Sequence, residues 1–157
     1  LIKNHGVTDI FTDTWSQRGF NFKFTDLLAS FGLVQLTRVK GRIKRLKEIY
    51  RKYSAATEEL PFINMVPLKI DSGEFPIYSE VLCSERGQLI SFLSKHGIQT
   101  RPVPPNLSIS DYIEHDGNFP NSEVFSKQGL YLPSGPDQSL ENVDYVISAL
   151  KQFQGHK

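Results

Sequence analysis

One long helical pattern constrains the fold of this 157-residue chain more than any other feature. Apolar side chains recur at alternating spacings of three and four, which places them along one face of an α-helix. They are Leu36, Val39, Ile43, Leu46, Tyr50 and Tyr53. The side-chain oxygen of Thr25 or Asp26 can accept a hydrogen bond from an unpaired backbone N–H at the helix start. We therefore predict a helix from Thr25 to about Thr57, roughly 50 Å long, which is longer than one small domain.

Shorter elements follow this helix. Two predicted strands, 65–70 and 76–83, are separated by the turn signal Asp71-Ser72-Gly73. Ser84 can cap a helix that ends at His96-Gly97, where glycine suits a left-handed C-cap. The remaining predicted elements are a strand at 98–101, a helix at 122–128, a strand at 130–132 and a last helix capped by Ser139. This order predicts an α+β fold, in which a small, mostly antiparallel sheet carries helices on one face.

Composition and charge exclude several classes of protein. The chain is 39% hydrophobic and 22% charged, which is typical of a globular protein. Its net charge of +1 gives no general attraction to nucleic acid. Cys83 is the one cysteine, so we expect a buried free thiol and no internal disulfide. No apolar run reaches the ~20 residues of a membrane span, and no signal peptide is recognisable. We expect a cytoplasmic protein with neither a nucleic-acid nor a membrane partner.

The sequence contains no complete catalytic or metal-binding motif. Its histidines lack metal-ligand spacing, and we find no nucleophile elbow, phosphate loop or dinucleotide fingerprint. The segment 38–52 carries eight basic residues and one acidic residue. Such a helix can bind nucleic acid or an acidic membrane surface, although a solvated face is the simpler interpretation. No motif or stacking aromatic group accompanies the charge, so a binding module remains an alternative.

Asn21 is the strongest single candidate for binding. It stands between Phe20 and Phe22, just before the predicted helix. Its amide N–H₂ can donate to a phosphate, and a helix N-terminus favours negative charge. Lys23 would add a positive charge. The alternative is that Asn21 only organises the turn before the helix.

The segment Gly19-Phe20-Asn21-Phe22-Lys23-Phe24-Thr25-Asp26 resembles a motif of the DegT/DnrJ/EryC1/StrS family of sugar aminotransferases, which use pyridoxal phosphate (PLP). Further similar segments follow in the same order along nearly the whole chain. They are Gly32-Leu33-Val34-Gln35-Leu36, His96-Gly97-Ile98, Phe119-Pro120-Asn121-Ser122-Glu123, Leu130-Tyr131-Leu132-Pro133 and the ending from Leu140 to Leu150. Each segment alone is weak, but the ordered set is fairly specific.

This resemblance implies the C-terminal part of a type I PLP-dependent transferase fold. Residues 1–57 would form the end of a large domain and a connecting helix, and residues 58–157 a small α+β domain. Family members are homodimers with active sites at the interface. By this resemblance, Asn21 would contact the phosphate of the PLP held by the partner subunit. Lys23 replaces the usual arginine of the family, which keeps the charge but loses the bidentate fork.

The resemblance also implies a substrate side. His5 is similar to the loop that follows the PLP lysine of the family, and the loop from Arg101 to Tyr112 would face the substrate. Family members often have Pro-Leu-His in this loop, whereas this chain has Pro105-Asn106-Leu107-Ser108. The histidine is absent, and Arg101, Asn106 and Ser108 are the remaining candidates.

We expect the chemistry to require a longer parent protein. The resemblance places the imine-forming lysine of the family upstream of His5, so we predict that these 157 residues neither retain PLP nor transaminate. The parent would transfer an amino group from an amino acid, with glutamate as the expected donor, to a nucleotide-linked ketosugar. Two alternatives stay open: a lysine-less dehydratase or regulatory relative on the same fold, and an unrelated binding module that uses the basic helix.

Overall fold

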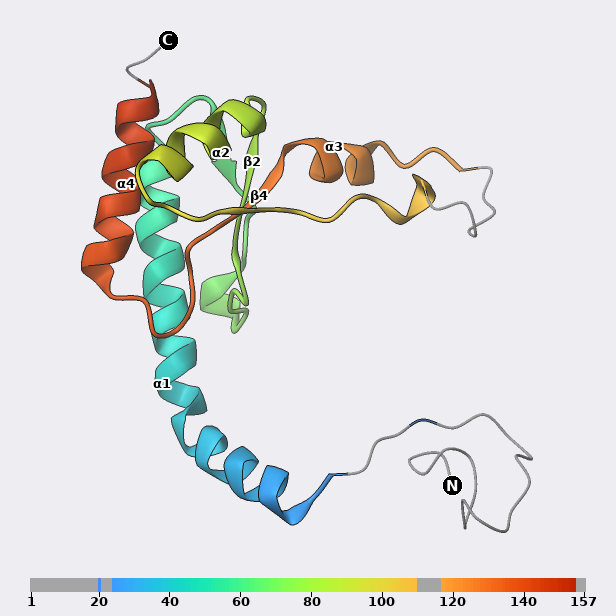
Figure 1. Ribbon diagram of the computed structural model, residues 1–157, viewed down its shortest axis with the longest axis vertical. Helices are drawn as coiled ribbons and strands as arrows, with labels where there is room; N and C mark the ends of the chain where they lie inside the picture. The colour runs from blue at the N-terminus through green and yellow to red at the C-terminus, as the bar shows by residue number, and fades with distance from the viewer. Residues whose placement is uncertain (1–19, 21–23, 110–116, 155–157) are drawn as a thin grey trace. The chain divides into compact units, whose positions relative to one another are not determined.

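The computed structural model describes residues 20, 24–109 and 117–154 (Figure 1). The chain divides into two compact units, 1–40 and 41–157. Helix α1 (Asp26–Thr57) confirms the predicted long helix and contributes to both units. The predicted division into domains at residues 57 and 58 stays a prediction.

In the first unit, the start of α1 is capped as expected. The Thr25 hydroxyl oxygen accepts a hydrogen bond from the backbone N–H of Leu28 at 3.3 Å. The apolar side chains of this part of the helix are exposed, including Leu36 at 65% and Val39 at 41%. The apolar stripe predicted along α1 is therefore buried only toward the C-terminal end of the helix, at Tyr50 and Tyr53.

The second unit contains a four-stranded antiparallel sheet in the order β1-β2-β4-β3. Its strands are β1 (Ile63–Met65), β2 (Ser79–Cys83), β3 (Arg101–Pro102) and β4 (Gly129–Leu132). Its other helices are α2 (Arg86–Lys95), α3 (Pro120–Gln128) and α4 (Leu140–Gln154), with 3-10 turns η1 (Ile70–Ser72) and η2 (Leu107–Ile109). The predicted α+β class is confirmed.

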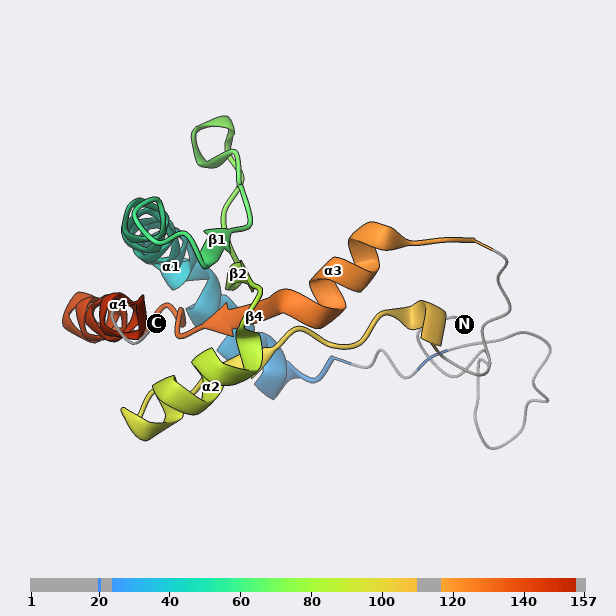
Figure 2. The ribbon, with the colours of Figure 1, turned by 90° about the horizontal axis from the view of Figure 1, so that it is seen from above.

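The core lies between one face of the sheet and three helices. Figure 2 shows α2, α4 and the C-terminal part of α1 on one side of the sheet and α3 on the other. The alternating side chains of β2 that face the core are fully buried, namely Ser79, Val81 and Cys83. The helices contribute Ile49, Tyr53, Leu89, Leu93, Val143 and Leu150 to the same cluster. Cys83 is buried and free, as predicted.

Tyr53 joins α1 to the end of β4. Its ring is fully buried, and its hydroxyl donates to the backbone oxygen of Pro133 at 2.9 Å. Burial raises the pKa of this hydroxyl far above its usual value, so it remains a protonated donor. The next residues, 134–139, lead to α4, where the Ser139 hydroxyl accepts from the backbone N–H of Asn142 at 3.1 Å as predicted.

The structure corrects the predicted strand at 65–70. Strand β1 ends at Met65, and the chain continues without regular structure to η1. Pro67 has no N–H to donate to a neighbouring strand. In addition, the Tyr50 hydroxyl donates to the Val66 oxygen and accepts from the Leu68 N–H, both at 2.9 Å. A helix side chain therefore satisfies backbone groups that a sheet would otherwise pair.

Other boundaries also differ from expectation: β2 begins at Ser79 rather than at residue 76, and α3 begins at Pro120 rather than at residue 122. Helix α2 has Glu85 as its N-cap without a side-chain capping bond, so the predicted Ser84 cap is wrong. Strand β3 starts at Arg101 rather than at residue 98, because the backbone N–H of Ile98 still donates to the Leu93 oxygen of α2 at 2.9 Å and pairing with β4 begins at Arg101. Gly97 itself has the expected left-handed conformation, with φ of 71°.

We expect opposite effects from two alanine substitutions in this region. The backbone N–H of Ser79 donates to the Ser134 hydroxyl at 2.9 Å, and both residues are buried. Ser134→Ala leaves that N–H without a partner and should lower the free energy of unfolding by about 1–3 kcal/mol.

The Ser79 hydroxyl has no partner within the described part of the chain. Ser79→Ala should therefore be neutral or stabilising. Urea unfolding measures both. Equal losses in the two variants would contradict this account.

Candidate functional site

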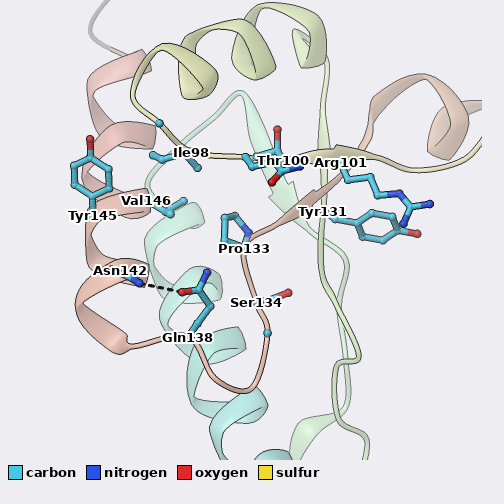
Figure 3. A pocket seen from close by; sticks show the side chains of 13 residues that line it. Ile98, Thr100, Arg101, Tyr131, Pro133, Ser134, Gln138, Asn142, Tyr145 and Val146 are labelled. Atoms are coloured by element: carbon cyan, nitrogen blue, oxygen red, sulfur yellow. Dashed lines mark hydrogen bonds between the residues drawn. The ribbon is translucent and has the colours of Figure 1, made fainter.

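The largest cavity that we describe in the second unit has a volume of about 660 Å³ and lies between β3, the end of β4 and α4. Segments 97–101 and 131–135 form two of its walls, and α4 contributes Asn142, Tyr145 and Val146. Figure 3 shows Arg101 and Tyr131 at one end of the cavity and Tyr145 at the other. Arg101 and Tyr131 are direct partners in the β3–β4 register.

Hydrogen bonds to the backbone fix the walls of the cavity. The Tyr145 hydroxyl donates to the His96 oxygen at 3.0 Å, which joins α4 to the turn before Ile98. On the opposite wall, Pro133 is held by the Tyr53 hydroxyl at 2.9 Å and Ser134 by the backbone of β2. The cavity is thus built by the packing of the core.

The lining of the cavity is polar and carries one formal charge, the guanidinium of the exposed Arg101. The Thr100 hydroxyl oxygen is buried and has no hydrogen-bond partner within the described residues. The Asn142 amide donates to the Gln138 side-chain oxygen at 3.1 Å, which fixes the orientation of both (Figure 3). No carboxylate lines the cavity, so its chemistry suits a polar ligand with negative charge.

The structure separates the predicted site residues. Arg101 lines the cavity, whereas Asn106 and Ser108 do not. These two contact each other instead, because the Asn106 amide donates to the Ser108 hydroxyl at 2.7 Å. His5, Asn21 and Lys23 lie outside the described residues, so their predicted roles stay predictions.

Several lining residues were not among the sequence-based candidates, including Thr100, Gln138, Asn142 and Tyr145. They come from segments about 40 residues apart, and only the antiparallel pairing of β3 with β4 brings them together. The cap predicted at Ser139 indicated where α4 starts. A local signal of this kind could not indicate that α4 lies beside residues 97–100.

The three cavities described in this part of the chain offer no lysine for covalent PLP binding. Covalent PLP binding needs a lysine amine that faces a cavity. No lysine lines this cavity, nor two smaller ones of about 310 and 400 Å³. Lys47 instead donates to the Ile70 oxygen at 3.1 Å, and Lys52 pairs with Asp144 at 2.7 Å. We therefore derive no reaction step through PLP from these residues.

The basic segment 38–52 is partly neutralised within the second unit. Arg45 pairs with Glu48, Arg51 with Asp71 and Lys52 with Asp144. These exposed pairs show that part of the positive charge faces acidic side chains of the same chain. Within the described ranges, no cluster of three potential metal-ligating side chains occurs, and no helix is long and apolar enough to cross a membrane.

Two curated proteins with similar sequences are named as a synthase and a transaminase of nucleotide-linked sugars. The chain is 28% identical to GDP-perosamine synthase of Vibrio cholerae over 97% of this chain and 43% of the relative. It is 31% identical to dTDP-4-amino-4,6-dideoxy-D-glucose transaminase of Escherichia coli, over 95% of this chain and 43% of the relative. The chain thus spans less than half the length of these relatives.

Solved structures share the fold. DesV of S. venezuelae, in complex with a ketimine intermediate, matches with a TM-score of 0.78 at 23% identity, over 98% of this chain and 42% of that one. The E. coli GDP-4-keto-6-deoxy-D-mannose-3-dehydratase with bound hydrated PLP matches with a TM-score of 0.72 at 21% identity. The match covers 92% of this chain and 40% of that one. These likenesses confirm the predicted fold.

The model of the DegT/DnrJ/EryC1/StrS aminotransferase family matches residues 1–151, which is nearly the whole chain. This match confirms the resemblance seen in the ordered motifs of the sequence. The chain belongs to the DegT/DnrJ/EryC1/StrS aminotransferase family.

Proposed function

We propose that this chain is the C-terminal portion of a cytoplasmic, PLP-dependent aminotransferase that acts on a nucleotide-linked ketosugar, with glutamate as the amino donor. The match of the family over residues 1–151 carries this proposal. Two relatives support the substrate class, because their names contain a GDP-linked and a dTDP-linked sugar. The remaining part of the parent protein would supply the lysine that binds PLP.

Within this proposal, the cavity beside β3 contributes to substrate binding. Arg101 is exposed at its mouth, and no carboxylate lines it to compete for the guanidinium. A guanidinium fork binds a carboxylate or phosphate through two parallel hydrogen bonds. Arg101 would therefore hold an anionic group of the sugar nucleotide or of the amino donor. Near the cofactor phosphate, we propose Asn21 as a hydrogen-bond donor and Lys23 as a positive charge. On the substrate side, the proposed residues are His5, Asn106 and Ser108.

The second candidate is a dehydratase or regulatory relative that lacks the lysine. The likeness to the E. coli dehydratase shows that this activity occurs on the same fold. The discriminating residue lies in the part of the parent that this chain does not represent. Reading the residue at the position of the family lysine in the full-length protein separates the candidates. Formation of an amino sugar that depends on glutamate would select the aminotransferase.

We expect the isolated 157 residues not to bind PLP covalently, because no lysine lines the cavities of the described part. PLP bound to a lysine has a visible absorbance band that survives gel filtration. The measurement is the spectrum of the chain after incubation with PLP and removal of the free cofactor. The full-length protein, treated in the same way, is the positive control. A stable, stoichiometric band on the isolated chain would contradict this expectation.

We expect Arg101→Ala in the full-length enzyme to raise the KM of one substrate by about 10-fold or more, with a smaller effect on kcat. The physical reason is the loss of a charged contact made equally in the ground state and the transition state. Arg101→Lys should recover part of the affinity, because it restores the charge without the fork. Lys95→Ala, which removes an exposed positive charge outside the cavity, is the control. Unchanged KM values for both substrates in Arg101→Ala would remove Arg101 from the site.

We further infer that the parent is a homodimer and that the isolated chain self-associates through the start of α1. Leu27, Phe31 and Leu36 are 62–68% exposed in the first unit. Apolar patches of this kind are usually covered by another surface. The triple change to glutamine should shift the chain toward monomer in sedimentation experiments. Leu107→Gln, at a residue 69% exposed in the second unit, should not. A wild-type chain that stays monomeric at high concentration would refute this inference.

A further inference from the structure

A second cavity of the unit formed by residues 41–157 has aromatic walls and one acidic group. It has a volume of about 400 Å³ and lies between α1, the segment after β1, β2 and β4. Its walls include the rings of Tyr50, Phe75, Tyr78 and Tyr131, and its lining contains the carboxylate of Glu80. None of its lining residues is basic.

The sheet places the acid beside the rings. Glu80 and Tyr131 are direct partners in the β2–β4 register, so their Cβ atoms are about 5 Å apart. Tyr78 lies just before β2 and lines the same cavity as Glu80 and Tyr131. The rings of Tyr78 and Tyr131 have centroids 4.9 Å apart at an angle of 46°. Two aromatic rings and a carboxylate thus meet on the face opposite the core.

The hydroxyl of Tyr50 is already used by the backbone. The Tyr50 hydroxyl donates to the Val66 oxygen and accepts from the Leu68 N–H, so Tyr50 offers only its ring to the cavity. The half-buried Glu80 takes part in none of the ion pairs of the described residues. The carboxylate therefore determines the charge of a ligand that would fit there.

We propose that this cavity is a binding site for an organic cation, a substituted ammonium or a guanidinium group. The faces of aromatic rings attract such cations, and a neighbouring carboxylate neutralises their charge. An anion would meet the charge of Glu80, and a divalent metal ion would find one carboxylate where it needs six or more oxygen ligands. A neutral apolar ligand would fill the cavity but leave the carboxylate partly desolvated without compensation.

The test compares two molecules of the same shape. Choline carries a quaternary ammonium group, and 3,3-dimethyl-1-butanol replaces its nitrogen by carbon. Each is titrated into the isotope-labelled 157-residue chain while NMR follows the backbone amides of Tyr78, Glu80 and Tyr131. We expect choline to shift these signals with at least ~10-fold higher affinity than the neutral analogue. Equal affinities, or no shift with any cation up to high millimolar concentration, would overturn the proposal.

Variants separate the carboxylate from the rings. Glu80→Gln keeps the shape of the side chain and should weaken choline binding by about 10-fold. Glu58→Gln, at an exposed acid outside the cavity, should have no effect. Tyr78→Phe keeps the ring and should retain binding, whereas Tyr78→Leu should lose most of it. Signal dispersion reports folding, and the two conservative glutamine variants decide the outcome if Tyr78→Leu does not fold. Full affinity in Glu80→Gln would refute the assigned role of the carboxylate.

A parallel titration with N-acetyl-arginine amide distinguishes the source of the cation. Tighter binding than choline would assign the site to an arginine side chain of a protein, because the planar guanidinium stacks on aromatic rings. Tighter binding of choline would assign it to a free quaternary ammonium compound. In both cases, Glu80→Gln should weaken binding of the compound. If Glu80→Gln binds either compound as tightly as the wild-type chain does, that result counts against the site.

Discussion

The hydrogen bond from the buried Tyr53 to Pro133 is the contact on which the arrangement of the second unit depends. It joins residues 80 positions apart in the chain, one in α1 and one just after β4. Because the ring is fully buried, the bond lies in a low-dielectric interior, where loss of one partner costs more than the bond contributes in water. Tyr53 thereby fixes the point where the chain leaves the sheet and turns toward α4. Both the cavity beside β3 and the packing of α4 against α1 follow from that point.

The elements that the sequence predicted well are those whose signals are local. The periodicity of α1, the Thr25 and Ser139 caps and the glycine after α2 each depend on residues within a few positions of one another. The predicted strand at 65–70 failed for a non-local reason. Its apolar residues suit a sheet, but the Tyr50 hydroxyl, 16 and 18 residues away, binds the backbone there. Propensity could not reveal this competing partner.

The same distinction explains what could be predicted of the sites. Ordered motifs indicated the family and identified Arg101, and the structure places Arg101 at a polar cavity. Asn106 and Ser108 were candidates because they lie in the loop that faces the substrate in the family, and they bind each other instead of lining that cavity. Thr100, Gln138 and Tyr145 could not be found from the sequence, since their proximity depends on strand pairing and on the direction of α4.

Tyr131 connects the two cavities and separates their charges. It is the direct register partner of Arg101 in β3 and of Glu80 in β2, so the three side chains form a row across three strands. Neighbouring strands lie about 4.8 Å apart, which places the backbones of the acid and the base roughly 10 Å from each other. Tyr131 lies between them in the strand register, and Glu80 and Arg101 form no ion pair with each other in the described structure. Each charge consequently remains available to a ligand in its own cavity. Because Tyr131 lines both cavities and lies between the two charges in the register, we propose that it keeps the cavity proposed for an anion apart from the cavity proposed for a cation.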